Sequence, residues 1–240
     1  MQGDFKNGES LCEESLQHAT EICDLRTMGF CENMYGYIYL IKGDWKLSIE
    51  HFRKCIKYFE EANWLWPLSI ACSGLVYSYS FLNDQENALK YLEKVNKLKD
   101  ESQIVLFSSF MYWMLGSAYI NLDDLKSAQK YIEEALSLAK RNIDKHGQGM
   151  SLIDIGRILA ETDSSQIEKT GEYIRLGIVL LEKLNIIPHY SQGYFYLGQF
   201  YANTGQKEKA LENLKNAEEM FQEMGMDYWL AKTKEFLDKL

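Results

Sequence analysis

Apolar residues along this chain recur three and four positions apart, with very little strand-like alternation. That spacing is typical of amphipathic helices. Only two prolines occur among the 240 residues, Pro67 and Pro188. Proline is tolerated in the first turn of a helix and interrupts a helix elsewhere, so each of them is expected near the start of a helix. The pattern therefore predicts an all-α protein.

A segment of about forty residues repeats along the chain. Each copy has a small residue at the start of its second half, which we call its anchor. Five such anchors are 40, 40, 42 and 40 residues apart: Ser48, Ala88, Ala128, Thr170 and Ala210. A second small or compact residue lies upstream of each anchor: Gly36, Val76, Gly116, Gly156 and Gly198. Small residues at these spacings predict two helices that cross closely, where larger side chains would overpack at a cost of roughly 1–3 kcal/mol.

This register resembles the tetratricopeptide repeat, a pair of antiparallel helices (A and B) whose small residues lie at the crossing. The resemblance implies a right-handed α-solenoid built of such pairs. The familiar unit has about 34 residues, so the longer unit here indicates helices lengthened by a turn or so. The expected helix pairs are 29–63, 66–99, 102–142, 146–184 and 188–224.

The two ends of the repeat array are incomplete units. Residues 8–24 resemble a second helix without its first, and residues 226–240 form a lone closing helix. We therefore expect one repeat domain over residues 1–240, cut from a longer protein or continuing the packing of another domain. The C-terminal segment also resembles the end of bacterial multidomain signalling proteins that carry a nucleotide-binding ATPase and sometimes a cyclase or DNA-binding domain.

The fourth full pair deviates from the others. The segment "ETDSSQIEKT" adds two residues between its helices, and Thr170 and Gly177 replace the usual alanines. This predicts a longer loop and a looser helix pair. The preceding segment "KHGQGM" is expected to form a flexible turn.

Charged residues are missing from three long segments, 62–83, 102–122 and 184–206. Each coincides with the A helix of a pair. Their length suffices for a membrane span, but serine, glutamine, asparagine and proline occur in them, and they alternate with charged amphipathic segments. We therefore interpret them as uncharged faces of a soluble protein that a partner covers.

In the tetratricopeptide family the A helices line the concave face of the superhelix. The resemblance therefore implies a neutral binding groove, with aromatic rings for apolar contact and amides for a peptide backbone. Tyr77 and Phe195 can equally fill the interior, Trp113 favours the groove, and Asn121 and Asn203 can simply end their helices. The predicted groove residues are Asn33, Tyr37, Ser73, Tyr77, Trp113, Ser117, Asn121, Ile153, Arg157, Phe195, Gln199 and Asn203.

The composition narrows the function further. A net charge of −9 argues against nucleic acid, which requires clustered Lys and Arg, and gives no polybasic segment for an acidic membrane. The five cysteines lack a CxxC motif and suit reduced, mostly buried thiols in a cytoplasmic protein. Scattered histidines, among them His51 as an ordinary surface residue, predict no metal or other cofactor. No phosphate loop or nucleophile–base set appears.

The sequence thus predicts a non-enzymatic scaffold or regulatory module that binds a peptide or partner domain in its groove, as part of a larger signalling protein. Three alternatives remain open. The groove holds an apolar small molecule, the groove or the open N-terminal end self-associates into a homo-oligomer, or the helical repeats bind RNA, which the acidic balance opposes.

Overall fold

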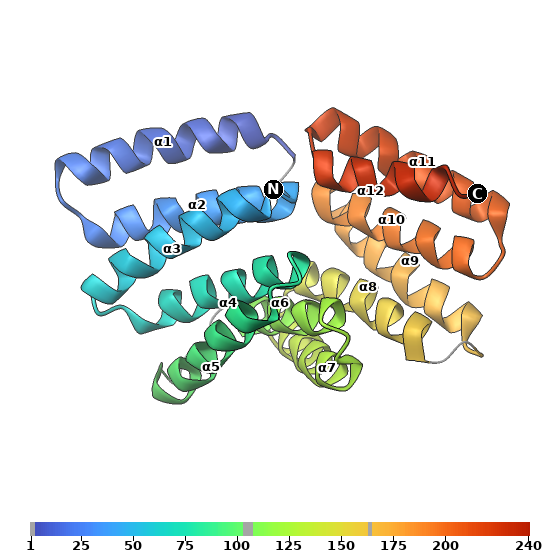
Figure 1. Ribbon diagram of the computed structural model, residues 1–240, viewed down its shortest axis with the longest axis horizontal. Helices are drawn as coiled ribbons and strands as arrows, with labels where there is room; N and C mark the ends of the chain where they lie inside the picture. Colours follow the sequence, from blue (N-terminus) through green and yellow to red (C-terminus); the bar gives the residue numbers. More distant parts are fainter. Residues whose placement is uncertain (1–2, 103–107, 163–164) are drawn as a thin grey trace. The chain divides into compact units, whose positions relative to one another are not determined.

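A computed structural model describes residues 3–102, 108–162 and 165–240 of the chain. Over these residues the protein is all-α and consists of antiparallel helix pairs (Figure 1). The helices are α1 Phe5–Glu21, α2 Leu25–Lys42, α3 Trp45–Glu61, α4 Leu65–Phe81, α5 Gln85–Ser102, α6 Ser108–Asn121, α7 Leu125–Arg141, α8 Lys145–Thr162, α9 Ile167–Lys183, α10 Ile187–Asn203, α11 Lys207–Met224 and α12 Asp227–Leu237.

Helix contacts divide the chain into two compact units. The N-terminal unit spans Asp4–Asp124 and holds α1–α6, and the C-terminal unit holds α7–α12 in Leu125–Leu240. In the N-terminal unit each helix from α1 to α4 packs on the next in sequence, and in the C-terminal unit each helix from α7 to α11 does so. The A helices also pack on each other, α2 on α4 on α6 and α8 on α10 on α12. The predicted all-α fold of stacked antiparallel helix pairs is confirmed within each unit.

The helix bounds lie within a few residues of the predicted pairs. Pro67 is the third residue of α4 and Pro188 the second residue of α10, so both prolines fall in a first turn as expected. Residues 103–107, at the start of the predicted pair 102–142, and residues 163–164 of the predicted long loop lie outside the described residues. The proposed single domain over 1–240 stays a prediction.

The turns between helices share one construction. A residue with positive φ follows most of the helices, and the next N–H donates to a carbonyl five residues back, as from Asp44 to Tyr39 and from Asp84 to Tyr79. This is the hydrogen bond of a Schellman helix end. The positive-φ residues of these turns are Cys23, Gly43, Asn63, Asn83, Asp123, Ile143, Asn185, Gly205 and Gly225.

An aspartate directly after the turn starts several of the helices. Its carboxylate accepts from the N–H three residues on, at 3.2 Å from Leu47 to Asp44 and 2.9 Å from Gly147 to Asp144. Such N-caps stabilise a helix by about 1 kcal/mol each. The same arrangement occurs at Asp4, Asp24 and Asp84. The turn and the cap together fix where one helix stops and the next begins.

The core confirms the predicted helix crossings. All five anchors and the five small or compact upstream residues are buried. A Cβ placed on Gly36 would lie 2.7 Å from the ring of Phe52, and one on Gly198 would lie 2.6 Å from Cγ of Leu214. Cβ atoms do not approach other carbon atoms this closely without a shift, so glycine is what lets the two helices of these pairs meet.

The fourth pair is tighter than the sequence suggested, and the prediction of a loose pair is wrong. A Cβ on Gly177 of α9 would lie 2.5 Å from the carbonyl oxygen of Gly149 of α8. The two backbones therefore touch, which alanine at either position would prevent. The segment "KHGQGM" is likewise not a flexible turn, because it forms the first turns of α8 and buries Gly147, Gln148 and Gly149.

Candidate functional site

The predicted groove residues of the N-terminal unit lie mostly inside the protein. Asn33 and Tyr37 of α2, Ser73 and Tyr77 of α4, and Trp113 and Ser117 of α6 are buried, and Asn121 is half-buried. Their assignment to partner binding stays a prediction. Their burial means that any partner would contact most of them only through a rearrangement of the unit.

The rings among them, together with Phe110 of α6, form a continuous aromatic row across the A helices. Tyr77 lies 5.5 Å from Trp113 between ring centroids, Trp113 lies 5.5 Å from Phe110, and Phe110 lies 5.3 Å from Tyr37. At these distances aromatic pairs contribute about 0.5–1.5 kcal/mol beyond burial. This row holds α2, α4 and α6 together.

Polar predicted residues in the same unit are used by the protein itself. The Asn33 amide oxygen accepts from the Cys55 thiol at 3.8 Å, and Ser73 donates to the Ser69 carbonyl within its own helix. Asn121, the last residue of α6, donates to the Ser80 hydroxyl at 3.0 Å. Burial holds the pKa of the Tyr37 phenol well above its usual range, so it stays neutral.

The predicted residues of the C-terminal unit divide into an inner and an outer set. Ile153 of α8 is buried beside Gly177 and Gly193, and Phe195 of α10 is buried, with its ring centroid 5.9 Å from that of Trp229 and 5.8 Å from that of Phe236 in α12. The outer set stays accessible: Arg157 and Gln199 are half-buried and Asn203 is exposed.

An ionic and aromatic cluster joins α8 to α10 in this unit. The Arg157 guanidinium donates to the buried Asp154 carboxylate at 2.7 Å and lies over the Tyr196 ring, 4.0 Å from its centroid. Tyr196 in turn packs edge-on to Trp229. Burial raises the pKa of the Tyr196 phenol, so it remains a neutral donor and acceptor.

Sequence reasoning missed Asp154 and Tyr196. The signal was present, because Asp154 stands three residues before Arg157, the spacing of neighbours on one helix face. Tyr196, Gln199 and Asn203 also share one face of α10 by their spacing of three and four residues. Together with Arg157 they make the outer A-helix face, by which we mean Arg157, Tyr196, Gln199 and Asn203 from here on.

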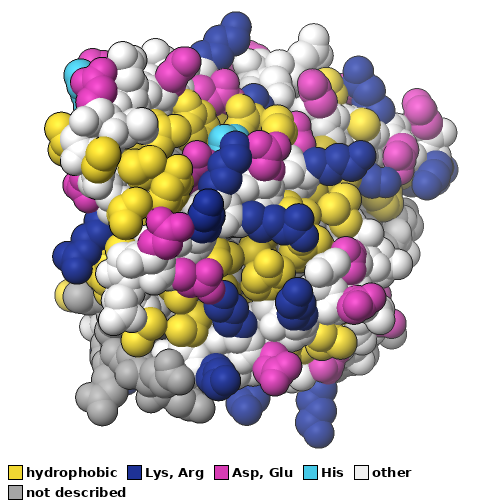
Figure 2. All heavy atoms as spheres, turned by 60° about the vertical axis from the view of Figure 1, so that its left-hand side comes forward, with side chains coloured by type: hydrophobic (Ala, Val, Ile, Leu, Met, Phe, Trp, Pro, Cys, Tyr) yellow, Lys and Arg dark blue, Asp and Glu magenta, His cyan; other side chains and the backbone are white. Residues whose placement is uncertain are grey.

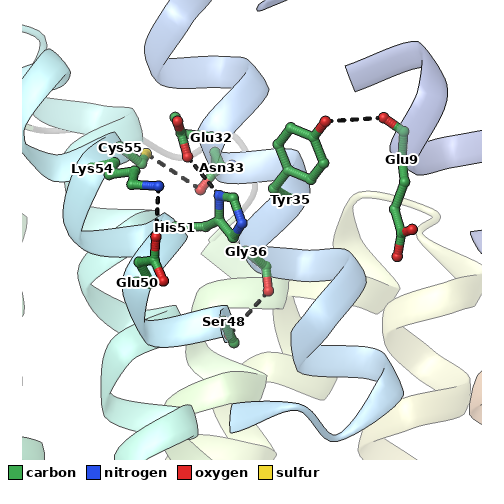
Figure 3. Close-up of polar contacts among 10 residues, drawn as sticks. All are labelled: Glu9, Glu32, Asn33, Tyr35, Gly36, Ser48, Glu50, His51, Lys54 and Cys55. Atoms are coloured by element: carbon green, nitrogen blue, oxygen red, sulfur yellow. Dashed lines mark hydrogen bonds and ion pairs between the residues drawn. The ribbon is translucent and has the colours of Figure 1, made fainter. Parts of the chain in front are cut away.

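A second polar cluster, between α1, α2 and α3, corrects the view of His51 as an ordinary surface residue. His51 Nδ1 lies 2.6 Å from a carboxylate oxygen of the buried Glu32, and the His51 ring stacks on Tyr35 with centroids 4.7 Å apart (Figure 3). Tyr35 donates to the Glu9 carbonyl at 3.1 Å, and burial raises its pKa to about 12. The chain of contacts runs from α3 through α2 to α1, so it serves helix packing.

Metal and thiol chemistry have little support in the described part of the chain. It contains no group of three or more His, Cys, Asp or Glu side chains suited to hold a metal ion. The five cysteines are free thiols, with Cys31, Cys55 and Cys72 buried. Burial raises the pKa of Cys72 to about 12, which keeps this thiol protonated and unreactive. Among the described residues no helix is both long and apolar enough for a membrane span.

Comparison with known proteins identifies the family. The tetratricopeptide repeat profile matches residues 33–61, 71–102, 111–142 and 191–223, more than half of the chain. The protein therefore belongs to the tetratricopeptide repeat family. A search of curated proteins found no significant sequence match.

Two solved structures resemble the chain in fold. BtubC (BKLC) from P. vanneervenii superposes with a TM-score of 0.60 at 15% identity, covering 92% of each chain. Aspartyl phosphate phosphatase F from Bacillus subtilis superposes with a TM-score of 0.58 at 18% identity, covering 92% of this chain and 58% of the phosphatase. Identity this low establishes a shared fold alone.

Proposed function

We propose that this protein is a non-catalytic module that binds a peptide or partner protein on the outer A-helix face of its C-terminal unit. Membership of the tetratricopeptide repeat family supports a role in protein–protein interaction. The observation that carries the choice of surface is the accessibility of this face, where Arg157 and Gln199 are half-buried and Asn203 is exposed. In the N-terminal unit most of the equivalent residues are buried.

The chemistry of this face suits an extended polypeptide without strong charge. Gln199 and Asn203 each offer a donor and an acceptor, the pair that a peptide group requires. Arg157 already faces the Asp154 carboxylate, so its charge is balanced within the protein. Its plane and the Tyr196 ring supply area for an apolar or aromatic side chain. The expected ligand is therefore a neutral segment with an aromatic or aliphatic residue beside backbone groups.

The cellular compartment and the larger protein to which the module belongs are part of the same proposal. We place the module in the cytoplasm, because its thiols are free, and as the interaction arm of a larger signalling protein, because the segment that includes α11 and α12 resembles the end of such proteins. Only the sequence of that segment supports the signalling setting, and it does not bear on the choice of binding face.

The test is capture of a partner by the intact chain, repeated with two matched variants. Gln199→Ala with Asn203→Ala removes two amides from the outer A-helix face. Gln129→Ala with Lys130→Ala removes two exposed side chains from the B helix α7. The captured protein is then titrated directly against each variant. We expect affinity to fall at least tenfold for the first pair and to stay unchanged for the second. Equal affinity for both variants would contradict the proposed surface.

A further inference from the structure

Two neighbouring turns of the C-terminal unit expose apolar side chains. Ile143, between α7 and α8, is 78% exposed, and Leu184, between α9 and α10, is 43% exposed. The rings of His146 and His189, just after these turns, have centroids 5.0 Å apart. The two turns therefore lie side by side and form one edge, called the Ile143 edge below.

The backbone at Ile143 makes its exposure notable. Its φ is +57°, in the left-handed region, which β-branched residues disfavour. Asparagine, aspartate or glycine occupies this position in most of the other turns. An isoleucine here is strained and also presents an apolar side chain to water. Local strain of this kind clusters at functional sites, and the 78% exposure of Ile143 leaves most of its side chain outside the core.

The charges around the Ile143 edge are mainly positive, although the chain as a whole is acidic. Asp144 caps α8, and Glu182 accepts from the Tyr194 hydroxyl, so both carboxylates are engaged. The exposed cations of the edge are Lys140, Arg141, Lys145 and Lys183.

Helix α1 of the N-terminal unit combines exposed aliphatic side chains with acidic ones. Leu11 is 56% exposed, and Ile22, directly after the helix, is 74% exposed. Glu14 and Glu21 are exposed as well, and their positions three and ten residues after Leu11 put them on the same side of the helix. His18 lies between them, with Nδ1 3.7 Å from the Glu21 carboxylate. We call Leu11, Glu14, Glu21 and Ile22 the α1 face.

The charge of α1 as a whole has the same sign as its exposed face. The helix contains four glutamates and a single lysine. One of the glutamates, Glu9, pairs with Lys42 of α2 at 3.1 Å, whereas Glu14 and Glu21 point away from that contact by their spacing along the helix. The α1 face is therefore acidic where the Ile143 edge is basic.

Charged and apolar side chains also lie side by side on the molecular surface in Figure 2. Lys and Arg, Asp and Glu, and hydrophobic side chains are interspersed on the side drawn there. Surfaces of this mixed kind are usual for soluble proteins. The α1 face and the Ile143 edge differ from such mixed surfaces, because each combines exposed aliphatic residues with charges of mainly one sign.

We infer that the protein self-associates head to tail, with the α1 face of one copy on the Ile143 edge of another. The two surfaces are complementary in charge, and each carries exposed aliphatic side chains that the contact would remove from water. Because the surfaces differ, the contact is heterologous and leaves one of each free, so association continues into a ring or a filament. This inference does not depend on the outer A-helix face binding a partner.

Charge reversal tests the pairing in both directions. Glu14→Lys with Glu21→Lys reverses the α1 face, and Arg141→Glu with Lys183→Glu reverses the Ile143 edge. Light scattering over a range of concentrations should give a mass above the 28.0 kDa of one chain for the unchanged protein at low salt. We expect each variant alone to stay monomeric and an equimolar mixture of the two to associate again, because each supplies the charge that the other lacks.

A third variant separates association from folding. Ile143→Asn removes the apolar side chain but places asparagine where the backbone favours it, so thermal stability should hold or rise while association weakens at least tenfold. Leu211→Asn, which removes an aliphatic side chain that is 43% exposed on α11, away from the Ile143 edge, should leave association unchanged. A monomer at every concentration, a mixture of charge variants that does not associate, or equal effects of Ile143→Asn and Leu211→Asn would overturn the inference.

Discussion

Replacing Gly177 by alanine probes the contact between α8 and α9, where the structure departs from the sequence-based expectation. Alanine is favoured over glycine in a helix interior by about 1 kcal/mol. On propensity alone, Gly177→Ala would therefore stabilise the protein. The new Cβ, however, would lie 2.5 Å from the Gly149 carbonyl oxygen and 2.6 Å from Cγ1 of Ile153.

The steric effect should exceed the gain in propensity. A backbone oxygen cannot turn away as a side chain can, so the two helices must separate. Overpacking of this kind costs roughly 1–3 kcal/mol, and separation also weakens contacts along the rest of the α8–α9 crossing. We expect a net loss of about 2 kcal/mol from the free energy of unfolding, within that range. For a chain of this length it corresponds to a fall in Tm of roughly 4–8 °C.

Gly171→Ala is the matched control, because it lies in the same helix. A Cβ there would meet first the end of the Arg175 side chain at 3.1 Å, which is able to move aside. This variant should be neutral or stabilising by up to about 1 kcal/mol. Thermal and urea unfolding of both variants measures the difference. If Gly177→Ala is as stable as Gly171→Ala, then α8 and α9 do not make backbone contact and the reasoning fails.

Two further predictions follow from the buried groups. Trp113→Ala should lower the free energy of unfolding by about 3–5 kcal/mol, measured by urea unfolding, because its ring packs on Tyr77 and Phe110; an unchanged urea midpoint would place Trp113 at the surface. Burial, with His146 alongside, holds the pKa of His189 well below 6.5. Below about pH 6.5 the unfolded chain therefore binds a proton at this histidine that the folded protein does not bind. Stability should fall as the pH falls through this range. Thermal unfolding from pH 7.5 to 5.5 should show a shallower loss of stability for His189→Gln than for the unchanged protein, whereas equal slopes for the two proteins would contradict the low pKa of His189.

Much of the fold could be predicted from the sequence, because the same pattern of small residues recurs in several units. The five anchors and their upstream partners fix which faces of neighbouring helices cross, and all of these residues are buried. The residues of the turns between helices gave a further signal, which the prediction from periodicity did not use. An αL residue followed by a capping aspartate marks the helix junctions at Gly43 and Asp44, and at Asn83 and Asp84.

The fourth pair could not be judged from residue type alone. A glycine in a helix lowers its intrinsic stability, which is why Gly177 suggested looseness. Whether glycine weakens a helix or allows a closer contact depends on what lies opposite, and Gly149 is 28 residues away in sequence. The segment around Gly147 was misjudged for the same reason, because tertiary packing overrides a weak local propensity.

The candidate site was harder to predict from the sequence than the fold. Helical spacing shows on which side of the helix a residue lies, but not how deeply its side chain is buried. Tyr77 and Gln199 were both placed on the A-helix face, yet the first is buried and the second half-buried. Aromatic rings gather in the interior because they bury large apolar areas, so the residues that looked best suited to a ligand serve the core. Among the predicted residues of the C-terminal unit, Arg157, Gln199 and Asn203 stay accessible.

The most direct test of the proposed function is site-specific photo-crosslinking from single positions. A photoreactive residue at position 203 lies on the outer A-helix face, and one at position 130 lies on the exposed side of α7. If the outer A-helix face binds the partner, the captured protein should be cross-linked from position 203 and not from position 130. Cross-linking from position 130 alone would contradict the account.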